Sequence, residues 1–429
     1  MRSARLAALS GIVLASSGAI AAPITIHAGR LIAVPGQAVR GPSTIVVDNG
    51  RIVSVTAGFQ SAAGQLIDLR DKTVLPGLID AHVHLTSDRA GNEGLVAEVT
   101  ESTSMRAFET ELNGMKTLRA GFTTVRNLGD GPEGSTLAYR DAIARGWVKG
   151  PRIISAAQSL STTGGHMDGR NGMSDEMDAH MSTHHLCDGP ADCRRAVRSQ
   201  VSRGADVIKI ATTGGVNSGT GLLTRMEQDE AEALIRTAHA YGKKVAVHSH
   251  GRDGTKLALR NGADSIEHGT DMDDETVRLF KTANACYVPT LSTVNGYLER
   301  LAKDPNAYPP AVKKQIDWRI GITGKSLEKA YPAGVKICFG TDAGVSKHGR
   351  NADEFELMVK HGMPAAQAIK AATVNNAELL GIADETGTIE PGKSADIIAV
   401  AGDPLADVRV LKSVAFVMAR GEVVPKPGS

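Results

Sequence analysis

Short apolar runs alternate with amphipathic stretches through the middle of the chain. Helical spacing is clearest in residues 229–241, where apolar side chains recur every three or four positions. The strand-like runs number eight, at residues 73–85, 122–128, 152–160, 207–212, 244–250, 265–268, 286–291 and 336–341. Eight strands joined by crossover helices predict an α/β fold, a (β/α)8 TIM barrel over residues 73–385. A doubly wound open sheet is the alternative, but no Gly-x-Gly-x-x-Gly turn follows the first run to favour it.

Both chain ends have a different pattern, made of short alternating segments and tight turns. Residues 43–55 predict a hairpin with Asn49 and Gly50 at its turn. Near the other end, residues 395–400 and 414–424 are strand-like, with a turn at Arg420 and Gly421. We therefore expect residues 22–72 and 386–429 to build one small β-sandwich domain together.

The first 21 residues have the pattern of a signal peptide. A short basic region precedes an apolar stretch of small residues, and Ala19-Ile20-Ala21 fits a small-x-small cleavage site. A membrane anchor is the alternative, but the stretch is too short and too rich in Gly, Ser and Ala. We expect cleavage before Ala22 or Pro23, and export to the periplasm or the extracellular space.

The composition limits which binding partners and which disulfides are expected. A net charge of +1 and 3% aromatic residues give no support for binding nucleic acid. No later stretch approaches the ~18 apolar residues of a spanning helix, so no membrane partner is expected after signal removal. Cys187 and Cys193 flank a turn-rich loop that a disulfide could close. Cys286 and Cys338 lie in apolar runs and are predicted to be buried thiols.

Residues that bind metals or carry charge stand at the ends of several runs. Active sites of barrels lie at the carboxyl ends of the strands, so these side chains are expected to meet. His248 alone would be interpreted as a core histidine and Asp342 alone as a helix cap, whereas a lysine inside an apolar strand needs a partner or a modification. The set comprises His82, His84, Lys209, His248, His250, Glu267, His268 and Asp342.

These motifs resemble the amidohydrolase superfamily, in particular its imidazolonepropionase-like branch of Xaa-Pro and Xaa-Arg/Lys dipeptidases and bacterial ochratoxin A-hydrolysing enzymes. The resemblance covers nearly all of the chain after the signal peptide. The segments that carry it are 76–84, 121–126, 208–209, 247–250, 266–269, 340–344, 348–351, 371–373 and 387–396.

The resemblance implies a centre of two zinc ions. His82, His84 and Asp342 would hold the more buried ion, and His248 and His268 the more exposed one. Lys209 would bridge both ions as N6-carboxylysine, because carbamylation turns a buried cation into an anion that offsets two dications.

The resemblance also implies a hydrolytic mechanism, in which the two metals activate a water molecule. Asp342 would take its proton and pass it to the leaving amine, and His166, in the loop after the third run, would polarise the scissile carbonyl. Candidates for binding a substrate carboxylate are His250, Arg170, Arg252 and the backbone of Gly214 and Gly215. Three further histidines are expected on the surface or in a lid, namely His180, His184 and His185.

The expected activity is hydrolysis of an amide bond next to a C-terminal amino acid. Dipeptides and N-acyl amino acids are the substrate class, which includes ochratoxin A with ochratoxin alpha and phenylalanine as products. A lactonase, an esterase or a phosphotriesterase with the same metal centre is the alternative. A metal-binding or transport protein without catalysis is a third, against which the proton-shuttling role of Asp342 argues. The resemblance further implies a homo-oligomer.

Overall fold

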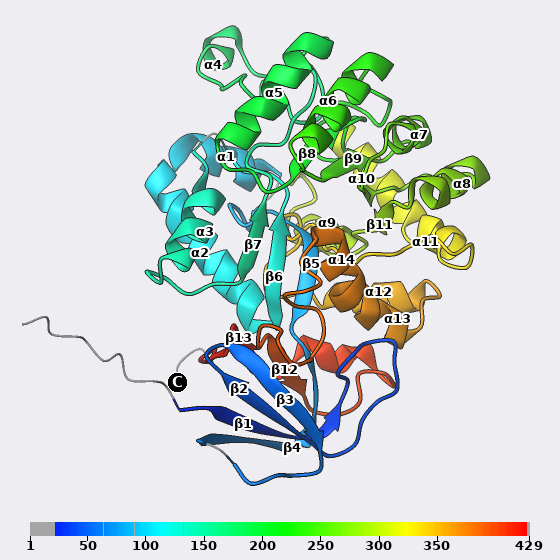
Figure 1. Ribbon diagram of the computed structural model, residues 1–429. Coiled ribbons are helices and arrows are strands. Elements are labelled where there is room, and N and C mark those ends of the chain that lie inside the picture. Colours follow the sequence, from blue (N-terminus) through cyan, green and yellow to red (C-terminus); the bar gives the residue numbers. More distant parts are fainter. Residues whose placement is uncertain (1–21, 63, 90, 132, 427–429) are drawn as a thin grey trace, which may run out of the picture.

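The computed structural model describes residues 22–426 apart from 63, 90 and 132. The predicted signal peptide lies outside the described residues. Figure 1 shows a sheet built from the chain ends beneath a larger body of strands and helices, which holds the middle of the chain.

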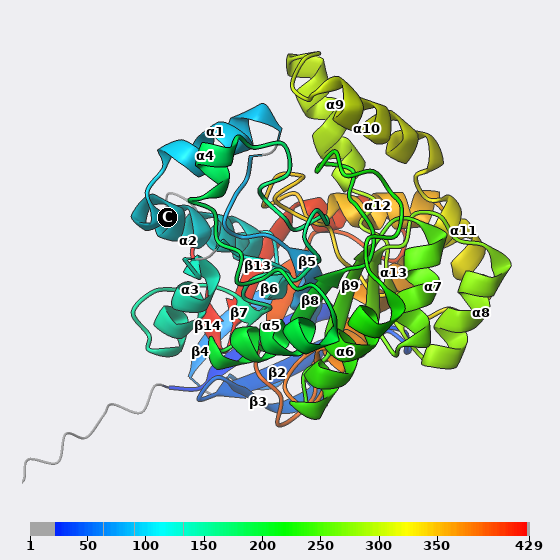
Figure 2. The ribbon, with the colours of Figure 1, turned by 90° about the horizontal axis from the view of Figure 1, so that it is seen from above.

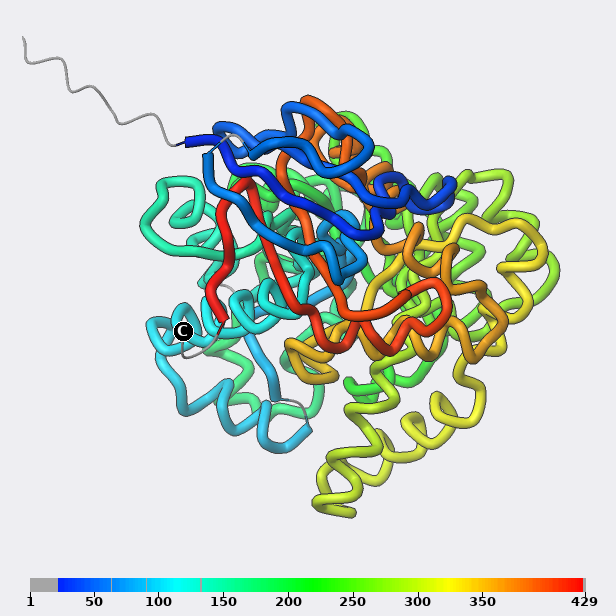
Figure 3. The backbone as a smooth tube through the Cα atoms, turned by 90° about the horizontal axis from the view of Figure 1, so that it is seen from below, coloured from blue at the N-terminus to red at the C-terminus, as the bar shows by residue number. Residues whose placement is uncertain are grey.

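Within the described residues, strands from both chain ends form one seven-stranded sheet in the order β14-β13-β12-β4-β1-β2-β3. Figure 3 shows the first strands, in blue, beside the last strands, in red. Its strands are β1 (Ile24–Leu31), β2 (Ser43–Asp48), β3 (Arg51–Ala57), β4 (Gln65–Pro76), β12 (Ile397–Val400), β13 (Val414–Ala419) and β14 (Glu422–Val423). The joining of the two chain ends is confirmed, whereas a second sheet packed on this one, as a sandwich requires, is not assigned among these residues.

The seam between the chain ends lies at β4. This strand pairs with β1 in parallel and with β12 in the antiparallel direction, with Leu75 opposite Ile398. The predicted turns are confirmed, because Asn49 and Gly50 have φ of 48° and 78°, and Arg420 and Gly421 have φ of 50° and 79°. Two successive positive φ angles match the right-handed twist of the flanking strands.

The middle of the chain forms two smaller parallel sheets. The three-stranded sheet has the order β5-β6-β7 and the four-stranded sheet the order β11-β10-β9-β8. Their strands are β5 (Leu78–Val83), β6 (Phe122–Asn127), β7 (Arg152–Ser155), β8 (Ile208–Ala211), β9 (Val245–Ser249), β10 (Ser265–His268) and β11 (Cys286–Val288). Seven of the eight predicted runs thus contain a strand.

Main-chain hydrogen bonds link the two parallel sheets on both sides. On one side, the N–H of Leu160 donates to the carbonyl of Lys209 at 2.8 Å. On the other side, the eighth run forms a single bridge from Ile337 to Tyr287 rather than a strand. The same segment bonds to β5, where the N–H of Asp342 donates to the carbonyl of His82 at 2.7 Å. This connectivity is consistent with the predicted barrel.

Helices surround the parallel strands, which lie near the centre when seen from above (Figure 2). The predicted helix at residues 229–241 is confirmed as α6 (Gln228–Ala240), with Ala231, Leu234, Ile235 and Ala238 fully buried. No helix of the described chain is long and apolar enough to cross a membrane. The remaining helices are α1 (Asn92–Thr100), α2 (Thr103–Arg119), α3 (Ser135–Ala144), α4 (Asp175–Asp178), α5 (Pro190–Ser202), α7 (Arg252–Arg260), α8 (Asp274–Ala283), α9 (Thr293–Lys303), α10 (Pro310–Ile322), α11 (Lys325–Ala330), α12 (Asp353–Lys360), α13 (Ala365–Lys370), the π-helix η1 (Ala371–Asn375), α14 (Asn376–Leu380) and the 3-10 helix η2 (Val408–Lys412).

All four cysteines are in disulfides. Cys187 pairs with Cys193, a disulfide that the sequence left open. Cys286 pairs with Cys338, so the prediction of buried thiols is wrong for this pair, although both side chains are buried. The neighbouring bridge from Tyr287 to Ile337 holds the two segments side by side, which brings the Cα atoms of Cys286 and Cys338 to 5.8 Å.

Candidate metal centre

The six predicted metal ligands line one cavity of about 100 Å³. Five of them lie in or just after parallel strands: His82 in β5, Lys209 in β8, His248 in β9, His268 in β10, and His84 one residue beyond β5. Asp342 follows the eighth run, whose hydrogen bond to His82 holds it beside β5. The expectation that strand ends would bring these side chains together is therefore confirmed in space.

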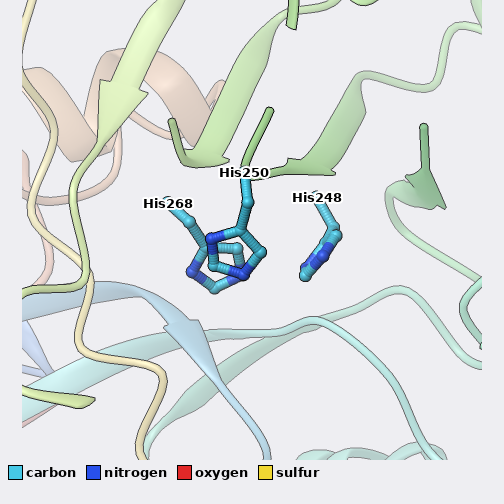
Figure 4. Close-up of side chains that lie close together, drawn as sticks. All are labelled: His248, His250 and His268. Carbon is cyan, nitrogen blue, oxygen red and sulfur yellow. The ribbon is translucent and has the colours of Figure 1, made fainter. Parts of the chain in front are cut away.

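Two groups of side chains in this cavity have the spacing of a metal site. In the first, ligand atoms of His82, His268 and Asp342 lie within 4.8 Å of one another, and in the second those of His248, His250 and His268 do so. Figure 4 shows the second group, in which the rings of His250 and His268 stack with centroids 4.7 Å apart. The Nε2 atom of His84 lies 3.2 Å from Asp342 Oδ1 and so adjoins the first group. His268 belongs to both groups, so the two positions are contiguous.

His82 is held by a buried ionic network that the sequence did not indicate. Its Nδ1 lies 2.9 Å from Glu267 Oε2, and Arg126 Nη2 donates to Glu267 Oε1 at 2.8 Å. Burial raises the pKa of Glu267, but Arg126 and the bond from His82 outweigh this and bring that pKa to about 2. Burial and the charge of Lys209 lower the pKa of His82 to about 4. Because a carboxylate only accepts, Nδ1 of His82 carries the proton and Nε2 offers its lone pair to the cavity.

The histidines of β9 and β10 have neutral partners instead. Nδ1 of His268 lies 2.7 Å from Thr290 Oγ1, and Nδ1 of His250 lies 2.8 Å from Thr270 Oγ1. Nε2 of His248 donates to the carbonyl of Gly214 at 3.3 Å. Burial is the largest cause that lowers the pKa of each of these histidines well below its usual value. All three rings are therefore neutral at pH 7, the state in which imidazole binds metals.

Lys209 is buried with 1% of its surface exposed, and its Nζ has no hydrogen-bond partner among the described residues. Burial lowers the pKa of this amine to about 8, although Glu267 and Asp342 act in the opposite direction. An orphaned buried amine is rare because its desolvation is uncompensated. This donor set, with one orphaned amine among imidazoles and a carboxylate, fits a metal centre that uses the lysine in modified form.

Asp342 is held in place by a buried carboxylate that the sequence analysis missed. Asp80 accepts hydrogen bonds from the N–H of Thr341 at 3.1 Å and from Asn351 Nδ2 at 2.7 Å. Burial raises the pKa of Asp342, but His82 and His84 outweigh it and bring that pKa to about 2. Asp342 also has a φ of 57°, an unfavourable angle for a residue other than glycine. Such strain persists only where surrounding contacts impose it, and it is common at functional sites.

His166 lines the same cavity, and its contact with substrate stays a prediction. Its ring stacks on that of His248 with centroids 4.1 Å apart, and its Nδ1 lies 2.9 Å from Ser218 Oγ. A Cβ atom on Gly215 would stand 2.1 Å from this ring, so only glycine fits there. Gly214 and Gly215 therefore contact the histidines of the site, and a direct contact of their backbone with substrate stays a prediction.

The arginines chosen from the sequence as carboxylate receptors are already paired. Arg170 Nε donates to Asp168 Oδ1 at 2.8 Å, and Arg252 Nη2 bonds Asp271 Oδ2 at 2.7 Å. Neither is among the described residues that line the metal cavity. A different arginine, Arg319 of α10, lines it. It stands in a helix whose apolar and polar residues are not separated onto two faces, so the sequence gave no signal for its direction.

A larger cavity of about 580 Å³ adjoins the metal cavity and shares His166 and Asn217 with it. Residues of the α1 region line it, including Arg89 and Glu101. Of the three histidines expected on the surface or in a lid, His180 and His184 are exposed. His185 is partly buried, with Nε2 2.9 Å from the carbonyl of Met167.

The fold and the cavity define a metal-dependent hydrolase, and comparison with known proteins gives its family. Residues 73–424 match the amidohydrolase family, and the chain belongs to that family. Ochratoxinase from Aspergillus niger is 29% identical over 431 aligned residues, which cover 94% of this chain and 87% of the relative. The resemblance found in the sequence is thereby confirmed.

Solved structures agree with this assignment. A Xaa-Pro dipeptidase with methionine bound in its active site is 40% identical, with a TM-score of 0.88 over 94% of this chain and 100% of that one. The structure of A. niger ochratoxinase is 27% identical, with a TM-score of 0.81 over 95% of this chain and 97% of that one. These relatives are amidohydrolases with barrels, which is consistent with the predicted fold.

Proposed function

We propose that this enzyme hydrolyses an amide bond next to a C-terminal amino acid, in a dipeptide or an N-acyl amino acid such as ochratoxin A. The observation that carries the proposal is the meeting, in one cavity, of imidazoles, the carboxylate of Asp342 and the orphaned amine of Lys209. The similarity to an ochratoxinase and to a Xaa-Pro dipeptidase supports the choice of bond.

The proposed cofactor is a pair of zinc ions. His82, His84 and Asp342 would hold one ion, His248 and His268 would hold the other, and Lys209 as N6-carboxylysine would contribute to both. The lowered pKa of Lys209 favours the modification, since the neutral amine adds to carbon dioxide, forms a C–N bond and releases a proton. When bound, the two ions supply Lewis acidity and lower the pKa of a bound water molecule.

Residues of this chain then position the substrate and move the proton. The Asp342 carboxylate, anionic at neutral pH, accepts a proton from the attacking water and passes it to the leaving amine. His166, whose Nδ1 lies 2.9 Å from Ser218 Oγ, would donate to the scissile carbonyl oxygen in the tautomer that carries its proton on Nε2. Burial lowers the pKa of His166 to about 4, so the ring acts as a neutral donor.

A substrate panel with product identification tests the proposal. Release of phenylalanine from ochratoxin A, or of the C-terminal residue from dipeptides or N-acyl amino acids, is the expected result. Turnover of lactones, simple esters or phosphotriesters without any amide cleavage would instead support the alternative hydrolase. Asp342→Asn should abolish turnover, and a variant with full activity would refute the proton-shuttling role.

The proposal also covers the domains that carry the site, the export of the enzyme and its oligomeric state. Residues 73–385 form a (β/α)8 barrel that carries the centre, and residues 22–72 and 386–429 form the small β domain. The enzyme is exported by its signal peptide to the periplasm or the extracellular space and assembles as a homo-oligomer. Amino-terminal sequencing of secreted protein and light scattering test these two points.

A further inference from the structure

One cation in the metal cavity has no role in the mechanism above. Arg319 on α10 is 2% exposed and lines the same small cavity as the candidate metal ligands. Nearby, the indole of Trp318 on the same helix lies 6.4 Å from the ring of His250. The guanidinium bonds the carbonyl of Thr290, whose hydroxyl lies 2.7 Å from Nδ1 of His268, so it sits on the His268 side of the cavity.

The hydrogen bonds of Arg319 leave part of its guanidinium unused. Its Nη2 donates to the carbonyls of Pro289 and Thr290, both at 3.2 Å, which anchors the group at the end of β11. Nε and Nη1 have no hydrogen bond to the described residues, and no carboxylate among these residues forms an ion pair with Arg319. A buried guanidinium without an anion is costly, and its planar fork matches a carboxylate.

We propose that Arg319 is the receptor for the free carboxylate of the substrate, and that it restricts the enzyme to bonds next to a chain terminus. The inference rests on the proposed function and names the side chain that recognises the substrate class of the enzyme. In a dipeptide or an N-acyl amino acid, only the amide nitrogen and one Cα separate the scissile carbonyl from the carboxylate carbon. The receptor must therefore lie in the metal cavity itself, which Arg319 lines and the carboxylate-paired Arg170 and Arg252 do not.

An apolar wall of the same cavity indicates which side chain the terminal residue carries. Val216, Tyr297 and Val345 line the same cavity, and Val216 and Tyr297 are 2% and 3% exposed. These surfaces are apolar and gain stability from covering an apolar group. The subsite therefore takes a carboxylate on Arg319 and an apolar side chain, such as that of phenylalanine, against this wall.

Matched substrates with and without the carboxylate test the receptor. L-alanyl-L-phenylalanine and N-acetyl-L-phenylalanine are each compared with their C-terminal carboxamides, in the metal-loaded enzyme. Arg319→Gln should lower kcat/KM for the carboxylate forms about 100-fold, mainly through KM, and change it less than about threefold for the carboxamides. Arg319→Lys keeps the charge without the fork and should give an intermediate loss. Arg252→Gln removes an arginine that is already paired and should leave the carboxylate preference unchanged.

Two kinetic results would overturn the inference. A preference for the carboxylate that survives in Arg319→Gln would show that another group binds it. An equal loss on both kinds of substrate, with metal content and unfolding midpoint unchanged, would mean that Arg319 only holds the loop of Pro289 and Thr290.

Calorimetry separates this inference from the proposed function, because it needs no turnover. L-phenylalanine should bind the wild-type enzyme at least about tenfold more tightly than L-phenylalaninamide, and Arg319→Gln should abolish the difference. Binding selectivity without amide hydrolysis would refute the proposed reaction alone. Equal binding of the two probes by the wild type would refute the receptor, even if amides are cleaved.

Discussion

The two sides of the metal cavity hold their histidines by different chemistry. We define the β5 group as His82, His84 and Asp342, and the β9–β10 group as His248, His250 and His268. His82 of the β5 group bonds to the carboxylate of Glu267, which Arg126 neutralises. The β9–β10 group bonds to two threonine hydroxyls and one main-chain carbonyl.

This difference determines how firmly each ring is set before metal binds. A carboxylate accepts only, so it fixes the proton of His82 on Nδ1 and increases the basicity of Nε2. A hydroxyl can donate or accept, so the threonines hold the rings of His250 and His268 in place but leave their tautomers free. We infer that the β5 group binds its ion more tightly and that the β9–β10 group adapts to substrate.

The largest effect on zinc content and activity is expected from substitution of Lys209, which would be a metal ligand shared by both groups. Lys209→Ala should reduce the zinc content from about two ions per chain to less than one and lower kcat/KM by about 1000-fold or more. A short carboxylic acid added with zinc should restore part of both, because it replaces the bridging carboxylate. Elemental analysis and kinetics measure the result.

Lys244 at the start of the β9 run provides the matched control. It is half-exposed, and its Nζ donates to the carbonyl of Glu378 at 3.1 Å. Lys244→Ala should keep metal and activity. One zinc ion per chain in a fully active wild type would contradict the bridging role of Lys209.

The next effect concerns protonation of the β5 group in the metal-free protein. The pKa of His82 is about 4 in the folded chain, against 6.5 for an ordinary histidine. Between these values the unfolded chain binds a proton that the folded chain does not, so the free energy of unfolding falls as pH falls from 6.5 towards 4. His82 alone contributes about 3 kcal/mol over this window.

Urea unfolding of chelator-treated protein at several pH values measures this contribution. His82→Gln should have a smaller loss of stability on acidification than the wild type. His239→Gln, at an exposed histidine bonded to Asp264, serves as the control for the substitution itself. If the free energy of unfolding fell equally with pH in the wild type and in His82→Gln, the role of burial at His82 would be contradicted.

The network behind His82 should have a smaller effect that is confined to the β5 group. Glu267→Gln removes the charge and the fixed tautomer, and should weaken the tighter of the two zinc sites by about 10- to 100-fold. Zinc titration against a competing chelator resolves the two sites. Glu275→Gln, at a partly exposed glutamate paired with Lys256, should leave both affinities unchanged. Equal weakening of both sites by Glu267→Gln would erase the distinction between the groups.

The smallest effect is expected on the other side of the cavity. Thr290→Val keeps the shape of the side chain but removes the hydroxyl next to His268. Loss of one hydrogen bond to a neutral ring costs about 1 kcal/mol, so zinc affinity should fall about fivefold. The same zinc titration measures this change. A loss of affinity as large as that of Glu267→Gln would contradict the proposal that the carboxylate contributes more than the hydroxyl.

The sequence predicts the parts of the site that depend on local alternation. His82 and His84 are two positions apart, and each further ligand except Lys209, which lies inside its run, lies near the end of its own apolar run, so a parallel arrangement brings them together. The turn at Asn49 and Gly50 follows in the same way from local backbone preferences.

Partners that depend on distant packing could not be predicted in this way. Glu267 stands beside His268 in the chain yet bonds to His82, although β10 and β5 belong to different parallel sheets, because their side chains meet in the interior between these sheets. Cys286 and Cys338 are 52 residues apart and become neighbours only through the register of their segments. Arg319 reaches the cavity from α10, whose sequence pattern does not indicate its direction.

The seam between β4 and β12 has a consequence for synthesis of the protein on the ribosome. Residues 73–76 must wait for residues 397–400 before their free edge is covered, so the entire catalytic body is made first. Until then β4 presents unpaired backbone groups to other chains. Release of a chain that ends before β12 would therefore expose an aggregation-prone strand, so a segment translated near the end protects one translated near the start.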